Sequence, residues 1–364
     1  METTRVESLP PPPGVINSIK AGFDAISAHI AVILLPLVVD LFLWLGPRLS
    51  MERLFLSIQS DVTAIWRASG VSASDIQNVM EWYQTMIPKL NLFWLLRTLP
   101  IGVSSLMFAR DFSQTPLGVT SIWQVSAESL VGWVGLLVLL GWIGGGLYFR
   151  WVARLSLAGE APVTAETPRA SAGQRQAPPP GTLQGDASQE DASQYDLLRP
   201  GRAISQTVLL SIFWSGVSLA LGLPIFILVS ILFQLNSFVA QIVILAASFL
   251  SMWLVVPMFF WPHGVFVKKQ NALISILSSL QLARFTLPTS SMFVLTIFLL
   301  GVGLNFVWSI PPADSWMTVV GILGHAFITT ALLAASFIYY RDMSAWLQTV
   351  LERLKANHTV TKQA

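Results

Sequence analysis

Asp40 is the residue whose type and position in this sequence could most directly support chemistry. It lies inside the apolar run from His29 to Ser50, with no basic residue within three turns on its N-terminal side. A carboxylate in hydrocarbon costs on the order of a few kcal/mol unless it is paired, protonated or in reach of water. Asp40 is therefore expected to be a structural, hydrogen-bonded or ion-paired acid, or else a carboxylate that couples protons or ions.

Two other polar residues are placed where they could act on Asp40. An eleven-residue step at about 100° per residue returns to nearly the same face of a helix, so His29 and Asp40 should share one side of the first span. Asp40 lies toward the outer end of that span, where Arg97 could approach it. We hypothesise that Asp40 is ionised and paired with Arg97, with Arg48 as the competing partner.

The last apolar run contains a second polar stripe. Thr318, His325, Thr329 and Ser336 are spaced by seven, four and seven residues, which is helical spacing on one face, with His325 near mid-depth. Serine and threonine in spans usually bond neighbouring helices or their own backbone. We interpret His325 as a packed neutral imidazole or, alternatively, as a ligand. We interpret three further polar residues in or beside the spans as ordinary interhelical hydrogen-bonding groups: Asn305, Gln241 and His263.

No other motif for chemistry is present. The sequence has no P-loop, HExxH, GxSxG or paired-carboxylate pattern, its four histidines lack metal spacing, and it contains no cysteine. The glycines in "GWIGGGLYF" lie inside an apolar run rather than after a strand, so they are not a nucleotide loop. We therefore expect no catalytic residue, no metal and no cofactor.

The composition indicates that the segments containing these residues are surrounded by lipid rather than by water. Of 364 residues, 54% are hydrophobic and 11% are charged, and the mean hydropathy is +0.64. An average soluble domain has about 25% charged residues. A net charge of +2 gives no reason to expect nucleic acid as a partner. The expected partner is the lipid bilayer.

Six runs are long enough to cross a bilayer, which takes roughly 20 residues each. They predict an all-α, polytopic transmembrane bundle with spans at Phe23–Leu45, Leu130–Phe149, Val208–Leu232, Phe238–Phe260, Met292–Ser309 and Trp316–Tyr340. The connections suggest an orientation with both termini in the cytoplasm. The segments this places inside contain Lys20, Arg150, Arg154, Arg169, Arg175, Arg199, Arg202, Lys268, Lys269, Arg284, Arg341, Arg353 and Lys355. The outside turns "QLNS" and "PPADS" contain no basic residue, which is the positive-inside pattern.

The spans are organised into two halves. Residues 1–21 form a cytoplasmic tail, residues 22–158 a two-span half with a large outside loop at 46–127, and residues 203–340 a four-span half. Residues 159–202 join the halves and are rich in Pro, Gly, Ala, Ser and Gln, a composition that predicts a disordered linker. Residues 341–364 form an amphipathic cytoplasmic tail.

Several shorter elements are also expected. Apolar residues at helical spacing in 51–66, 268–284 and 341–355 predict amphipathic helices that lie on the membrane surface or pack on the bundle itself. A further helix is expected from Ser74 to Ile87. Asn91–Phe108 contains Arg97, Pro100 and Gly102, and we interpret it as a re-entrant or interfacial element. Pairs of small residues predict close helix contacts: Gly141 with Gly145, Ser218 with Gly222, and Ala331 with Ala335.

The region from Val208 to Leu354 resembles a family of uncharacterised six-span bacterial proteins related to the membrane domain of some glycerophosphodiester phosphodiesterases. The resemblance rests on the layout around "FFWPHGVFVKKQNALISILSSLQLARFTLPTSSMFVL" and on the ending "HAFITTALLAASFIYYRDM". It implies a six-span helical domain in a bacterial plasma membrane. The catalytic barrel of those enzymes is missing, because no segment could form a (β/α)₈ domain of about 250 residues.

Three classes of function remain. The first is a non-enzymatic membrane component, meaning a scaffold, assembly factor or accessory subunit. The second is a transporter or channel that uses Asp40, His29 and His325, and the third is a membrane-embedded enzyme that acts on lipids. Convergence of the three ionisable residues on one water-filled cavity would favour transport, and a sealed ion pair would favour the scaffold. A lateral opening to lipid beside a His/Asp pair would favour an enzyme.

Overall fold

The computed structural model describes residues 11–108, 110, 114–158 and 201–363, and the predicted linker lies almost wholly outside them. The described chain is helical. Its helices are α1 (Val15–Ala28), α2 (Leu34–Leu45), α3 (Glu52–Ala68), α4 (Ala73–Met86), α5 (Ala127–Leu157), α7 (Gly201–Leu235), α8 (Ser237–Val267), α9 (Ala272–Trp308) and α10 (Thr318–Gln363). Three 3₁₀ turns are η1 (Ile30–Ile33), η2 (Ile87–Lys89) and η3 (Leu92–Leu96). Strand β1 (Arg48–Ser50) pairs in parallel with β4 (Ile122–Gln124), and β2 (Gln114–Thr115) pairs antiparallel with β3 (Gly118–Val119).

Five helices are long and apolar enough to cross a membrane, and each covers all or nearly all of one predicted span. They are α5, α7, α8, α9 and α10. Helix α1 and the chain from Ile30 to Leu45 add a sixth span if this bent pair is counted as one. The prediction of an all-α, multi-pass membrane bundle is thereby confirmed.

The first predicted span is not one straight helix. Helix α1 ends at His29, whose φ of −132° and ψ of 54° are not helical, and the two parts meet at 93°. Pro36 lies in the first turn of α2, where its missing N–H is tolerated, whereas a helix continued through it would bring its ring against the carbonyl of Val32. The expectation that His29 and Asp40 share one helical face is therefore wrong, because no single helix carries both.

Two of the expected amphipathic stretches are continuous with spans. Residues 272–284 form the first part of α9, which bends at Thr286 two residues before Pro288. Of their apolar stripe, Leu273, Leu277 and Leu280 are exposed, as on an interfacial helix, whereas Ile276 is buried in the main apolar core. Residues after Tyr340 instead continue α10, and the buried Met343 and Leu347 pack on the chain's own bundle.

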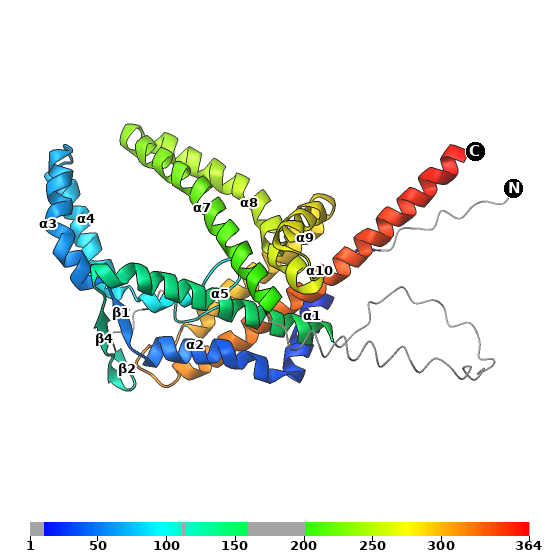
Figure 1. Ribbon diagram of the computed structural model, residues 1–364, viewed down its shortest axis with the longest axis horizontal. Coiled ribbons are helices and arrows are strands. Elements are labelled where there is room, and N and C mark those ends of the chain that lie inside the picture. Colours follow the sequence, from blue (N-terminus) through cyan, green and yellow to red (C-terminus); the bar gives the residue numbers. More distant parts are fainter. Residues whose placement is uncertain (1–10, 109, 111–113, 159–200, 364) are drawn as a thin grey trace.

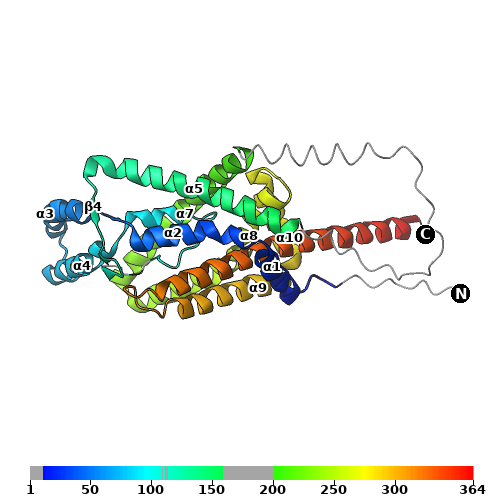
Figure 2. The same cartoon turned by 90° about the horizontal axis from the view of Figure 1, so that it is seen from below.

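The helices form an elongated bundle with two projecting hairpins. In Figure 1, α2, α5 and the first part of α10 run along one another, while the α7–α8 hairpin diverges from them. The α3–α4 hairpin extends from the end of the bundle at which α2 ends and α5 begins, and Figure 2 shows the same separation from below. Ser72, rather than Ser74, accepts a hydrogen bond from the backbone N–H of Asp75 and caps α4.

Hydrogen bonds tie the connections together at each end of the bundle. At one end, Trp44 Nε1 donates to the carbonyl of Ala313 at 2.7 Å, which joins α2 to the turn between α9 and α10. At the other end, the backbone N–H of Ala272 donates to the side-chain oxygen of Gln206 at 2.8 Å, joining α9 to α7. The loop between α2 and α5 therefore lies at the same end of the bundle as the α9–α10 turn. The α8–α9 connection and the start of α7 lie at the opposite end.

Candidate functional site

The segment from Asn91 to Phe108 enters the bundle and returns without crossing it. Its chain lies against two glycines of α5: a Cβ at Gly141 would be 2.7 Å from the carbonyl oxygen of Leu96, and one at Gly145 would be 2.8 Å from the Cα of Gly102. Arg110 then donates to the carbonyls of Ser309 and Pro311, at the end where the segment began. The segment is thus re-entrant. The close approach predicted for the two glycines is made to this loop rather than to another helix.

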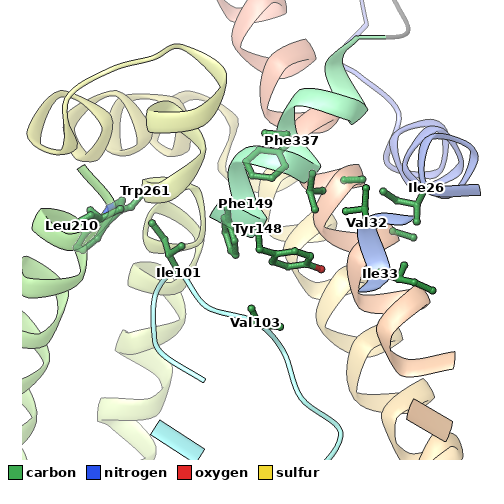
Figure 3. Close-up of a cluster of buried hydrophobic side chains, with 14 of the residues drawn as sticks. Ile26, Val32, Ile33, Ile101, Val103, Tyr148, Phe149, Leu210, Trp261 and Phe337 are labelled. Atoms are coloured by element: carbon green, nitrogen blue, oxygen red, sulfur yellow. The ribbon is translucent and has the colours of Figure 1, made fainter. Parts of the chain in front are cut away.

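The deepest part of the re-entrant segment is held in the main apolar core. Figure 3 shows Ile101 and Val103 on the loop, with Tyr148 and Phe149 of α5 and Phe337 of α10 in the same cluster. All five side chains are buried. Irregular backbone at membrane depth is tolerated where protein surrounds it, and this cluster provides that protein environment.

Asp40 fixes the returning part of the segment. The hydroxyl of Ser105 donates to Oδ1 of Asp40, and the backbone N–H of Leu106 donates to Oδ2 at 3.0 Å. Ser105 Oγ also accepts from the backbone N–H of Met107 at 3.1 Å. The carboxylate is fully buried, so these two donors replace the water that it lacks.

Arg97 is not the ion-pair partner of Asp40, contrary to our hypothesis. Its guanidinium lies 4.6 Å from the ring centroid of Phe108, in a cation–π contact, and its side chain is exposed. The competing partner, Arg48, donates instead to the carbonyls of Pro88 and Lys89 at 2.9 and 3.1 Å. A serine hydroxyl and a backbone N–H give each carboxylate oxygen one donor without a cation.

In the described part of the chain, none of the other predicted site residues is hydrogen-bonded to Asp40. His29 is exposed at the bend after α1. His325 is buried in α10, and Thr329 donates to its carbonyl at 2.8 Å. Asn305 is half-buried near the far end of α9. Within the described ranges, no group of three or more His, Asp or Glu side chains could hold a metal ion.

A separate cavity of about 460 Å³ lies beside the re-entrant segment, where α7 and α8 diverge from the rest of the bundle. Its lining is mostly apolar and contains no charged residue among those the structure describes. The residues are Leu99, Pro100, Gly102, Ser104, Tyr148, Phe149, Trp214, Val255, Met258, Phe259, Pro262, His263, Ile297, Gly301, Thr329, Leu332, Leu333 and Ser336. Of the polar residues singled out in the sequence, His263, Thr329 and Ser336 are among them.

The cavity contains a polar pair that the sequence did not reveal. His263 Nε2 and Ser336 Oγ lie 2.7 Å apart, although 73 positions separate them. The imidazole is otherwise enclosed by rings, among them Phe259 and Phe337 at centroid distances of 5.3 and 4.8 Å. Both residues were noted in the sequence, Ser336 as the last member of the polar stripe, but only the packing of α8 on α10 brings them together.

These features define a class: a helical multi-pass membrane protein with a carboxylate-anchored re-entrant segment and a neutral intramembrane cavity. Comparison with protein-family models, with curated proteins and with solved structures finds no match to this chain.

Proposed function

We propose that this chain is a non-enzymatic component of a bacterial plasma membrane, acting as a scaffold, assembly factor or accessory subunit, with both termini in the cytoplasm. The observation that carries the proposal is the contact of Asp40 with Ser105 and Leu106. A carboxylate that carries protons or ions must exchange with water or substrate. Asp40 instead holds a loop, and neither His29 nor His325 lines the cavity.

A surface for a partner is available on α7. None of the most apolar stretch of this helix is buried within the chain. The small pair Ser218 and Gly222, expected to make close helix contacts, is exposed, and a Cβ at Gly222 would meet nothing within 4 Å. Because small residues let helix backbones approach closely in lipid, this face suits a transmembrane helix of another subunit.

Proton flux tests the proposal against the transporter alternative. Purified protein is reconstituted into liposomes that contain a pH-sensitive dye, and a pH gradient and a membrane potential are imposed. We expect the same flux as in protein-free liposomes, with a proton ionophore as the positive control. Flux that appears with the protein and disappears in Asp40→Asn would overturn the proposal and favour transport.

Site-specific photo-crosslinking tests the partner surface. A photoreactive residue at Gly222 in cells should yield a defined protein adduct. Gly132 in α5 is the matched control, because a Cβ there also meets nothing within 4 Å, and it should yield lipid adducts only. The same pattern at both positions would argue against a partner on α7.

The enzyme alternative has one observation in its favour, the His263–Ser336 pair in the cavity. A serine nucleophile needs a general base within hydrogen-bond reach, and that base is normally oriented by a third group. Aromatic rings, rather than a carboxylate, surround His263 in the described part of the chain. Ser336 also lies 2.7 Å from the carbonyl of Leu333, to which its hydroxyl can donate. We therefore assign this pair to binding rather than to catalysis.

A further inference from the structure

We propose that the cavity between α5, α7, α8, α9, α10 and the re-entrant segment binds a neutral membrane lipid with a free hydroxyl group and a hydrocarbon chain. The inference is independent of the scaffold role and could hold if that role fails.

The size and lining of the cavity indicate a small amphiphile. Its volume of about 460 Å³ lies within the range of roughly 300–1,000 Å³ that is usual for small-molecule sites. Such sites combine apolar walls with a few polar groups that fix orientation. Here Trp214, Met258 and Ile297 are among the apolar residues.

The charge of the lining restricts the polar end of the ligand. Phosphates and carboxylates are held in proteins by arginine, lysine or clustered backbone N–H groups. The described lining has no arginine, lysine, aspartate or glutamate. A charged headgroup buried there would lack a counter-charge, so the ligand's polar end is uncharged.

The hydrogen-bonding state of the lining favours a hydroxyl. Thr329 already donates to the carbonyl of His325 and retains acceptor capacity. Ser336 Oγ, shared between His263 and the carbonyl of Leu333, also retains a lone pair. Ser104 makes no side-chain hydrogen bond to another described residue and has a donor to offer. A ligand hydroxyl can accept from Ser104 and donate to Thr329 or Ser336, which an ester carbonyl cannot do.

The rim of the cavity places the source of the ligand in the membrane. Val255 of α8 and Leu99 of the re-entrant segment line the cavity and remain 48% and 64% exposed. Both are apolar, and α8 is one of the helices that could span the bilayer. An apolar mouth on a lipid-facing surface admits a hydrocarbon chain sideways from the bilayer.

Photolabelling of the full chain tests the inference. The protein is reconstituted into phosphatidylcholine nanodiscs with a trace of monoacylglycerol whose chain contains a diazirine, and the adducts are mapped after irradiation. We expect adducts on α8 near Val255–His263 and on α10 near Leu332–Ser336, displaced by unlabelled monoolein. Methyl oleate, which keeps the ester but has no hydroxyl, and lysophosphatidic acid, which carries a charged phosphate in place of one hydroxyl, should displace them poorly.

Two glycines of α9 provide a matched pair of variants. Gly301 lines the cavity and Gly303 does not, yet a Cβ at either would meet nothing within 4 Å. Gly301→Phe should fill the cavity and reduce specific labelling by about tenfold, because it places a bulky side chain against the ligand. Gly303→Phe should leave the labelling unchanged.

Three outcomes would overturn the inference. One is equal specific labelling in Gly301→Phe and Gly303→Phe, and another is labelling spread evenly over the exposed face of α7. The third is displacement by lysophosphatidic acid as effective as by monoolein. If Gly301→Phe does not fold, Gly301→Leu replaces it, and the competition series on the unaltered chain decides the headgroup without any variant.

Discussion

Asp40 and Ser105 are hydrogen-bonded to each other across 65 positions of sequence, and this bond joins α2 to the returning part of the re-entrant segment. The neighbouring N–H of Leu106 binds the second carboxylate oxygen. The acid in the first apolar run thus has a structural use: it holds the loop and satisfies a backbone N–H that would otherwise be buried without a partner.

Double-mutant cycles should separate Ser105 from Arg97 as the partner of Asp40. Asp40→Asn and Ser105→Ala should each lower the free energy of unfolding by about 1–3 kcal/mol, because each leaves a buried polar group without its partner. Their coupling energy should lie in the range of about 0.5–3 kcal/mol expected for residues in contact. The measurement is reversible unfolding in mixed micelles.

The same cycle with Arg97→Gln supplies the control. Arg97 contacts Phe108 and is exposed, so its coupling with Asp40 should stay below about 0.5 kcal/mol. A larger coupling with Arg97 than with Ser105 would restore the ion pair and contradict the arrangement described above.

The approach of the re-entrant segment to α5 gives a second prediction. A Cβ at Gly145 would lie 2.8 Å from the Cα of Gly102 and 2.9 Å from the carbonyl oxygen of Ile101, so Gly145→Ala must displace backbone. We expect a loss of about 1–3 kcal/mol, the usual cost of overpacking, measured as a lower Tm in detergent. Gly144→Ala is the control, since a Cβ there meets nothing within 4 Å. Equal Tm values for the two variants would show that the loop is not packed against this face.

Much of the helical architecture could be predicted from the sequence because the solvent imposes it. Runs such as Val208–Leu232 and Phe238–Phe260 lie within α7 and α8, since lipid leaves an apolar run of this length few alternatives to a helix. The bend at His29 was missed because apolarity is continuous across it. Only Pro36 signals a break, and a proline is compatible with either a kinked span or a new helix.

The contacts of the site depend on irregular backbone and on helix packing, which no periodicity describes. Arg97, Pro100 and Gly102 disfavour insertion of this segment as a span, but the sequence leaves open whether it is re-entrant or interfacial. The hydrogen-bond partners of Asp40 could not be predicted from the sequence. They are a serine hydroxyl and a backbone N–H, and neither is a charged group that stands out in an apolar run. The pairing of His263 with Ser336 likewise requires knowledge of how α8 crosses α10.

Residues 162–196 should be dispensable for folding and insertion. This stretch lies outside the described residues, and the prediction rests on its composition, which cannot bury enough apolar surface to offset the entropy of ordering. Deleting it should leave the Tm in detergent within a few degrees of the full chain, because a change of 1 kcal/mol shifts the Tm of a large domain by about 2–4 °C. A greater loss would show that the segment packs on the bundle.

The orientation of the chain is the last prediction, and the absence of cysteine makes it simple to test. Basic residues cluster in the segments that we place in the cytoplasm. The α3–α4 hairpin and the α9–α10 turn should both lie on the outer side of the membrane. They share one end of the bundle, because Trp44 and Arg110, on either side of the hairpin in the chain, donate hydrogen bonds to carbonyls of Ala313 and Ser309. Ser60→Cys, at an exposed position of α3, should therefore react with an impermeant maleimide in intact cells, whereas Ser171→Cys in the linker should react only after the membrane is permeabilised. Labelling at one position alone could result from leaky cells, so the orientation is decided by comparing the two cysteine variants. Labelling of Ser171→Cys but not of Ser60→Cys in intact cells would invert the topology and place the re-entrant segment on the cytoplasmic face.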